Sequence, residues 1–396
     1  MSPSEIMRYT ALTEVIFGWN SLGVLGAQVK KLGGTKVLFV TDPGVKGAGI
    51  LEEAFKSLED ANIPIVLYDQ ATPDPDTQTI DQVVRMIKEN ECDFVVTAGG
   101  GSGMCTGKGA ALMATNPGNI RDYAGEDRYS HRTLPCIAIP TTAGSGSEVS
   151  RVTVITDEIT KFKLAIRGFD NAPNVAILDP VVLRTTPRAQ AVASGVDALT
   201  HAIEAYCARR ASPVTDGMAL PAMETIAKDI CPSILAGDPD ASARMLLASS
   251  MANFACGNAG LGLSHALNST ITATYKRQGY PPVAYGDIHA ILLPLVMEFN
   301  QPVQEERLAV IARALGVAKK KHKSEAVLAR AGIERLKELL SALNAPSKLP
   351  WDNVPDEVLV EMTKPLVDAA PVSPNPRRYT QQDLVGLLRK ALQGWD

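Results

Sequence analysis

Two polar residues four positions apart form the most informative pattern in this sequence. Asp197 and His201 lie in the segment GVDALTHAIEAY, where most neighbours are apolar. Residues four apart share one face of a helix, so the spacing places both side chains together on a largely buried surface. Buried polar groups need a partner, and a divalent cation supplies one. The spacing alone leaves a second interpretation open, a hydrogen-bonded Asp–His pair in a helical core.

A third residue of the same chemical kind follows in a separate segment. His265 stands at the start of another predicted helix, after the glycine-rich run GNAGLGLS. It could supply a further ligand from a facing element, although alone it is ambiguous. Ser194, just before Asp197, is predicted to cap the helix that carries Asp197 and His201.

Two glycine-rich segments end predicted strands. The strand CDFVVTA runs into GGGSG at residues 99–103, and IPTTAGSGSEVS at residues 139–150 repeats the pattern with threonines and serines. Glycines leave no Cβ in the way of a ligand, and free N–H groups at a helix start favour an anion. Either segment alone could be a tight connection. Together they favour one nucleotide lying across the carboxyl edge of a parallel sheet.

Asp42 ends the strand-like run TKVLFVTD. An acidic side chain at this position can accept hydrogen bonds from a ribose diol and would repel a 2′-phosphate. The residue therefore favours NAD over NADP.

The predicted secondary structure differs between the two halves of the chain. Short strand-like runs at 35–42, 63–69, 92–101 and 134–142 alternate with helical stretches, and VTVITDEITKFKLAI is predicted to form a hairpin. This βαβ order is typical of a parallel sheet. After the segment LRTTPRAQ, helical periodicity dominates. We therefore expect an α/β nucleotide-binding domain at 1–187 and an all-α metal and substrate domain at 188–396.

Composition limits the partners. The net charge of −4 gives no electrostatic footprint for nucleic acid, and no apolar run is long enough to span a membrane. The N-terminal segment lacks the pattern of an export signal, and six scattered cysteines suit reduced thiols. We expect a cytoplasmic protein with small-molecule partners. The basic run at 319–323 is interpreted as a solvated loop.

Nearly the whole chain resembles the iron-containing (group III) alcohol dehydrogenase family. The matching motifs are GGGSGMCTGK, PTTAGSGSEVS, the DP of VAILDP, GVDALTHAIEAY, NAGLGLSHAL, AILLPLVMEFN and NPRR, in the family's order and approximate spacing. The resemblance implies a Rossmann-like N-terminal domain, a helical C-terminal domain, a cofactor in the cleft between them and a homodimer or larger assembly. This is the superfold of dehydroquinate synthase.

The resemblance also implies roles for individual residues. Asp197, His201 and His265 would bind a divalent metal, Fe²⁺ or Zn²⁺. The residues expected along the NAD cofactor are Asp42, Gly99, Gly100, Gly101, Ser102, Thr141, Thr142, Ser145 and Lys163.

The chain departs from the family near the expected chemistry. Tyr285 stands where the family has a fourth metal-binding histidine, and His289, four residues later, stands where the family often has Asn. A neutral phenol is a poor ligand, so His289 is a candidate replacement, with substrate contact or packing as the alternatives. Ser269 replaces a second histidine of many relatives, and Cys105 replaces the Asp of the glycine-rich motif.

The predicted reaction is hydride transfer between nicotinamide and a small alcohol or aldehyde, with Ser269, Tyr285, His289 or water relaying the proton. Lys276, Arg277 and Tyr280, in a few extra residues after His265, suggest an anionic substrate group, although a solvated loop explains them as well. Two other functions stay open: a lyase similar to dehydroquinate synthase, which uses NAD only transiently, and a non-catalytic NAD-binding protein.

Overall fold

The computed structural model describes residues 8–318 and 324–395. It divides into two compact units, Ala11–Pro187 and a unit that joins Arg188–Asp396 with the described residues before Ala11. Thr10 belongs with the second unit because it exchanges two hydrogen bonds with Asn258, whereas the sequence assigned it to the first domain. The basic run at 319–323 and the first seven residues, on which part of the export prediction rests, lie outside the described residues.

The α/β unit is built on a six-stranded sheet in which all neighbouring strands pair in parallel. The parallel sheet predicted from the alternating segments is confirmed. The order across the sheet is β1 (Glu14–Phe17), β9 (Val175–Leu178), β6 (Cys136–Pro140), β4 (Phe94–Gly99), β2 (Val37–Val40) and β3 (Ile65–Tyr68).

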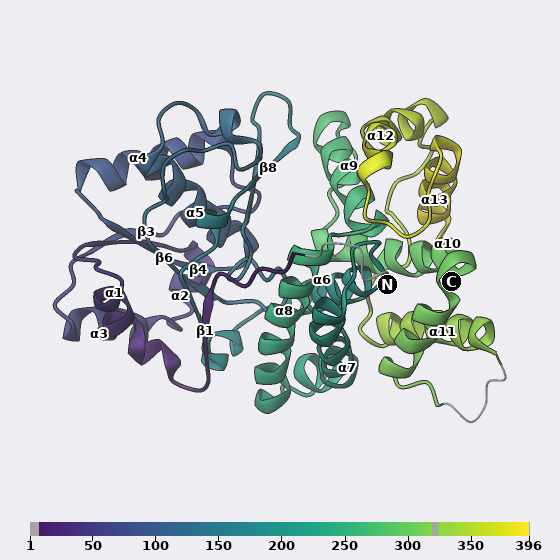
Figure 1. Cartoon of the computed structure of the whole chain (residues 1–396), viewed down its shortest axis with the longest axis horizontal. Coiled ribbons are helices and arrows are strands. Elements are labelled where there is room, and N and C mark those ends of the chain that lie inside the picture. Colours follow the sequence, from purple (N-terminus) through teal and green to yellow (C-terminus); the bar gives the residue numbers. More distant parts are fainter. Residues whose placement is uncertain (1–7, 319–323, 396) are drawn as a thin grey trace. The chain divides into compact units, whose positions relative to one another are not determined.

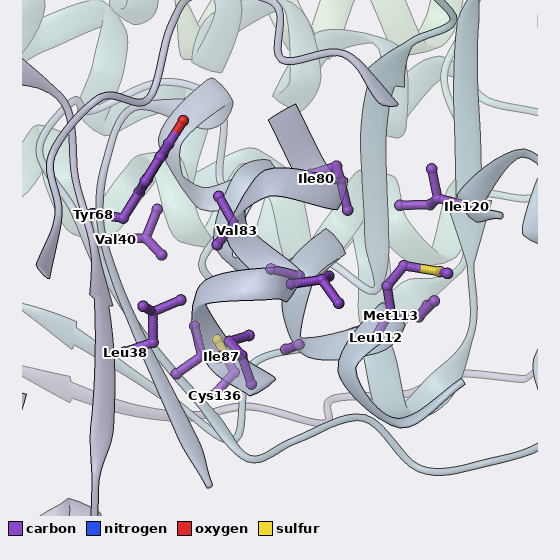
Figure 2. Close-up of a cluster of buried hydrophobic side chains, with 14 of the residues drawn as sticks. Leu38, Val40, Tyr68, Ile80, Val83, Ile87, Leu112, Met113, Ile120 and Cys136 are labelled. Carbon is purple, nitrogen blue, oxygen red and sulfur yellow. The ribbon is translucent and has the colours of Figure 1, made fainter. Parts of the chain in front are cut away.

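Helices cover both faces of this sheet, which is why its central strands are buried and mostly apolar, with Thr97 of β4 donating to the Gly103 carbonyl. In β2, Leu38 and Val40 pack against the residues of α4 (Thr77–Glu89) and α5 (Gly101–Thr115), a cluster shown in Figure 2. The alternate residues Val37 and Phe39 point to the opposite face, where α1 (Leu25–Lys31) and α3 (Glu52–Asp60) pack. Figure 1 shows the two helix pairs on either side of the strands. Successive side chains of a strand point to opposite faces of the sheet, so alternate residues of β2 contact different pairs of helices.

A second, three-stranded sheet completes the α/β unit. Strands β7 (Val152–Thr156) and β8 (Lys163–Arg167) pair antiparallel, so the predicted hairpin is confirmed, and β5 (Gly125–Glu126) adds to β8. The remaining short elements are α2 (Pro43–Gly47) and the 3₁₀ turns η1 (Ser21–Val24), η2 (Ile120–Tyr123), η3 (Phe169–Asn171) and η4 (Pro180–Leu183).

The second unit is helical over its described residues, as the periodicity after residue 188 predicts. Its elements are α6 (Arg188–Cys207), α7 (Pro213–Leu235), α8 (Pro239–Ala259), α9 (Leu263–Gln278), α10 (Tyr285–Ala314), α11 (Glu325–Ala342), α12 (Asp356–Ala369), η6 (Ala370–Val372) and α13 (Gln381–Gln393). Among the described residues, no helix combines the length and the apolar character that crossing a membrane requires.

Helix α6 lies at the centre of the helical unit, packed against α7, α8 and α10. Every residue from Val192 to Cys207 is buried, which is the property of a helix surrounded by other helices. Its polar side chains are therefore buried as well. Ser194 does not cap this helix, because α6 begins at Arg188 and the Ser194 hydroxyl donates to the Gln190 carbonyl 2.8 Å away.

The first turn of α10 lies directly against α6. A Cβ added to Gly286 would stand 1.9 Å from the carbonyl oxygen of Ala193, so no other residue fits there without movement of the backbone. This contact fixes the start of α10 beside the segment of α6 that carries Asp197.

Replacing Gly107 by Ala tests the packing of α5 on the sheet. The added Cβ would stand 2.6 Å from the Cβ of Thr97 on β4. We expect this overpacking to lower the free energy of unfolding by about 1–3 kcal/mol. Urea unfolding measures the change. Gly47→Ala is the control because a Cβ there meets nothing within 4 Å; equal losses in both variants would contradict the prediction.

Candidate metal and nucleotide sites

Two helices of the second unit bring Asp197, His201 and His265 together. Asp197 and His201 lie one turn apart on α6, and His265 lies in the first turn of α9. One ligand atom from each of the three residues lies within 4.8 Å of the others, and all three residues are buried. Spacing predicted that Asp197 and His201 share a helix face, and the family resemblance implied that His265 joins them; the structure brings the three side chains together, and their role as metal ligands stays a prediction.

A fourth residue, His289 on α10, approaches the same carboxylate oxygen, although the group whose ligand atoms all lie within 4.8 Å of one another holds only Asp197, His201 and His265. The Nε2 atoms of His201, His265 and His289 lie 3.9, 3.5 and 3.4 Å from a single oxygen, Oδ1 of Asp197. The ring of His265 lies between the other two, with centroids 4.6 Å from His201 and 4.1 Å from His289. The imidazoles therefore converge on one carboxylate oxygen from three different helices.

The convergent atoms fit a bound cation. Oδ1 of Asp197, Nε2 of His265 and Nε2 of His289 are all buried without a hydrogen-bond partner. Leaving a buried polar group unsatisfied costs about 1–3 kcal/mol, so several such atoms at one point call for a shared partner. One carboxylate and several imidazoles are the donors that Fe²⁺ and Zn²⁺ accept.

The pKa values of the clustered side chains are shifted by burial and by their charged neighbours. Burial raises the pKa of Asp197, but His201 and the other histidines outweigh it and hold that pKa below its usual range. Burial lowers the pKa of His265, but Asp197 and Glu204 raise it to about 9. Burial and the neighbouring His265 lower the pKa of His289. The lowered pKa keeps Asp197 ionised, so the imidazoles surround a negative charge.

Glu204 orients His265 and was not identified from the sequence. Its Oε2 accepts hydrogen bonds from Nδ1 of His265 at 2.7 Å and from the Gly262 amide at 2.9 Å, and its Oε1 accepts from the Ser264 amide at 2.6 Å. A carboxylate only accepts, so Nδ1 donates to Glu204, and Nε2 is the nitrogen that can bind a metal once its own proton is displaced. The available signal was spacing, since Glu204 shares a helix face with Asp197 seven residues earlier.

Tyr285 and Ser269 lie outside the group of convergent atoms. Tyr285 is 37% exposed, with its ring edge-on to His289 at 5.0 Å. Ser269 is exposed, and its hydroxyl donates to the His265 carbonyl on its own helix. Their predicted part in proton relay stays a prediction.

The two glycine-rich segments meet at the carboxyl edge of the α/β sheet. Gly100 immediately precedes α5, and the Thr141 amide donates to the Gly99 carbonyl at 3.0 Å. A Cβ added to Gly101 would meet Ser145 at 3.0 Å, and one added to Gly100 would meet Thr142 at 3.6 Å. The segments predicted to share one ligand are therefore neighbours, with the free N–H groups of the α5 start between them.

Asp42 lies at the same edge. It precedes α2, and its Oδ1 accepts from the Val45 amide at 2.9 Å. Its other oxygen, Oδ2, lies 3.6 Å from the position of a Cβ on Gly99. One oxygen is thus committed to the helix cap, and the other faces the glycine-rich turn.

Lys163 connects to this region through Asp74. Its Nζ lies 2.7 Å from Oδ1 of Asp74, whose amide donates to the Ser102 hydroxyl at 3.2 Å. Asp74 was not predicted from the sequence, because it is far from both partners along the chain.

Two further residues of this motif serve the fold. The buried Sγ of Cys105 accepts from the Val154 amide at 3.3 Å. Lys108 is buried on α5, and its Nζ donates to the carbonyls of Ser147, Ser150 and Val152. Together these contacts tie α5 to β7 and to the segment that leads into it.

The residues that suggested an anionic substrate have structural contacts. Arg277 lies 3.5 Å from a carboxylate oxygen of Glu361, and Tyr280 stacks on Trp351 with centroids 4.9 Å apart. These contacts explain both residues without a substrate.

Comparison with known proteins identifies the family. Residues 13–180 match the model for iron-containing alcohol dehydrogenase, and residues 191–392 match the model for the C-terminal region of the Fe-containing alcohol dehydrogenase family. The chain belongs to the iron-containing alcohol dehydrogenase family, as its motifs indicated.

Curated relatives match over nearly their whole length. The NAD-dependent methanol dehydrogenase of Bacillus methanolicus is 34% identical over 95% of this chain and 97% of its own. The 1,3-propanediol dehydrogenase of Citrobacter freundii is 32% identical over 95% and 96%. The crystal structure of a 1,3-propanediol oxidoreductase superimposes with a TM-score of 0.92 at 32% identity, covering 98% of this chain and all of that one. These matches confirm the predicted fold and favour a dehydrogenase over the lyase and the non-catalytic protein.

Replacing Glu204 by Gln tests its role at the metal site. An amide offers one acceptor oxygen where three N–H donors now point at a carboxylate, so His265 loses its fixed orientation. We expect metal affinity to fall by about 10–100-fold. Metal titration of the purified protein measures it. Ser269→Ala is the control on the same site; an unchanged affinity in Glu204→Gln would disprove the role.

Proposed function

We propose that this protein is an NAD-dependent alcohol dehydrogenase that interconverts a small alcohol and its aldehyde. The single observation that carries the proposal is the convergence of Nε2 atoms from three helices on Oδ1 of one buried aspartate. This arrangement would serve no purpose in a protein that only bound a nucleotide.

Asp197, His201 and His265 would hold a divalent metal, Fe²⁺ or Zn²⁺. When bound, such an ion polarises the oxygen of the alcohol or aldehyde as a Lewis acid. The residues of the chain supply the rest: Asp197 provides the negative charge, and Glu204 keeps the lone pair of His265 directed inward.

The carboxyl edge of the α/β sheet would bind the nucleotide. The α5 start offers N–H groups to the phosphates, and glycines leave room for the backbone to approach them. The other polar groups proposed to contact the cofactor are Asp42, Ser102, Thr141, Thr142, Ser145 and Lys163. NAD itself supplies the hydride chemistry when bound.

For the proton, Tyr285 is the stronger of the two hydroxyl candidates. Its side chain is partly exposed and its ring adjoins His289, so it can exchange protons with water next to the metal ligands. The Ser269 hydroxyl is instead directed at a backbone carbonyl.

The substrate is proposed to be small and uncharged. The relatives named above act on methanol and 1,3-propanediol. Arg277 faces Glu361 and Tyr280 stacks on Trp351, so neither residue requires an anionic substrate as its partner. We further propose a cytoplasmic enzyme that forms a homodimer or larger assembly; its six cysteines are all free, which suits a reducing compartment.

Metal loading combined with an NADH assay tests the function. Protein loaded with Fe²⁺ or Zn²⁺ should oxidise NADH with short aldehydes, and removal of the metal by a chelator should abolish turnover. Absorbance of NADH measures the reaction, and Asp197→Asn should lose activity because it removes the negative charge and replaces one carboxylate oxygen by an NH2 group. Absence of turnover with every metal and aldehyde would exclude the dehydrogenase, and substrate consumption without net NADH change would indicate a lyase.

Asp42→Ser tests the preference for NAD. Serine keeps the cap of α2, so the fold is preserved while the charge that repels a 2′-phosphate is lost. We expect the ratio of kcat/KM with NADPH to that with NADH to rise by about tenfold, the order expected from removing one partly exposed like charge. An unchanged ratio in steady-state kinetics would show that Asp42 does not face the ribose.

A further inference from the structure

His289 occupies a position in α10 that the motifs of the family do not assign to metal binding. The family places its fourth metal-binding histidine at the position of Tyr285, at the start of this helix. Tyr285 is 37% exposed here, whereas His289, one turn later, has no exposed surface. The family would place a buried metal ligand at position 285, but here residue 285 is partly exposed. The buried side chain is instead His289, one turn later.

The two nitrogens of His289 lie in different surroundings. Nδ1 lies 2.9 Å from the hydroxyl of Ser264, which fixes the plane of the ring. Nε2 lies 3.4 Å from Oδ1 of Asp197 and is buried without a hydrogen-bond partner. This is the arrangement of a metal-binding histidine, where one nitrogen is held by a neighbour and the other is directed at the ion.

Helix geometry explains how residue 289 reaches the place expected of residue 285. Side chains in an α-helix tilt toward its N-terminus, so a residue covers the turn that precedes its own Cα. The close contact of Gly286 with Ala193 holds that first turn against α6. The imidazole of His289 therefore projects back toward Asp197.

We propose that His289 is the fourth protein ligand of the metal, through Nε2, and that Ser264 positions its ring. The inference rests on the proposed function, since it concerns the same metal. The donor set becomes one carboxylate oxygen and three imidazole nitrogens from α6, α9 and α10, which suits Fe²⁺ or Zn²⁺. A purely structural histidine would leave Nε2 unsatisfied at a cost of about 1–3 kcal/mol.

Removing the imidazole at position 289 and then restoring one at position 285 tests this assignment. His289→Asn should lower the affinity for Zn²⁺ and Co²⁺ by about 100-fold or more, since loss of a ligand costs at least as much as loss of an outer hydrogen bond. Adding Tyr285→His to that variant should recover most of the affinity by restoring the family's arrangement. Tyr285→Phe is the matched control and should bind metal as the wild type does.

The outcomes separate this inference from the proposed function. If the wild type binds metal and His289→Asn binds it equally well, the inference is wrong and the dehydrogenase proposal stands. If the wild type binds no metal, both fail. The visible spectrum of the Co²⁺ form should change in His289→Asn and stay unchanged in Tyr285→Phe; a change in Tyr285→Phe alone would assign the ligand to Tyr285 and overturn the inference.

A measurement on the wild type covers the case in which His289→Asn does not fold. X-ray absorption of the Zn²⁺-loaded full chain counts its imidazole ligands through their multiple scattering. Three imidazoles support the inference. Two overturn it.

Discussion

The helical unit is arranged around one buried carboxylate. Asp197 lies on a helix that is enclosed on all sides, and transferring a charge into such surroundings is costly unless opposite charges or hydrogen-bond donors surround it. Direct hydrogen bonding does not meet this need at Oδ1, which instead faces three imidazole nitrogens at 3.4–3.9 Å. The packing of α10 on α6, and the hydrogen bonds of Glu204 to the start of α9, bring two of those imidazoles to the carboxylate.

Close backbone approach makes this arrangement possible. A Cβ on Gly262 would stand 2.8 Å from Oε1 of Glu204, so the glycine before α9 lets the helix start reach that carboxylate. The NPRR motif contributes at the same place: Oδ1 of Asn375 accepts from the Leu263 amide, and its side chain pairs with that of Asn300 on α10. A motif whose role was not evident in the sequence thus joins the start of α9 to the middle of α10.

The sequence predicted those features that depend on residues close together in the chain, and it missed those that depend on distant residues. The central strands were recognisable because both faces are buried, which makes nearly every residue apolar, whereas β1 (EVIF) was missed because its ends are exposed. Asp197 and His201 were found because helical spacing is local. Glu204 was missed because its burial depends on N–H donors some sixty residues later, at 262 and 264. The same limit left His289 with several interpretations until α10 was placed on α6.

The four positions that depart from the family pattern differ in their structural consequences. Cys105 accepts a backbone hydrogen bond within the α/β core, and Ser269 donates to its own helix, so each is accommodated where it stands. Tyr285 and His289 differ because their rings adjoin each other and one nitrogen faces the buried carboxylate. A site that needs a fixed number of donors can accept a histidine at either of two positions one turn apart on one helix face, because both can reach the same ion. On the proposal that His289 binds the metal, this helix keeps the number of donors and moves one of them by one turn.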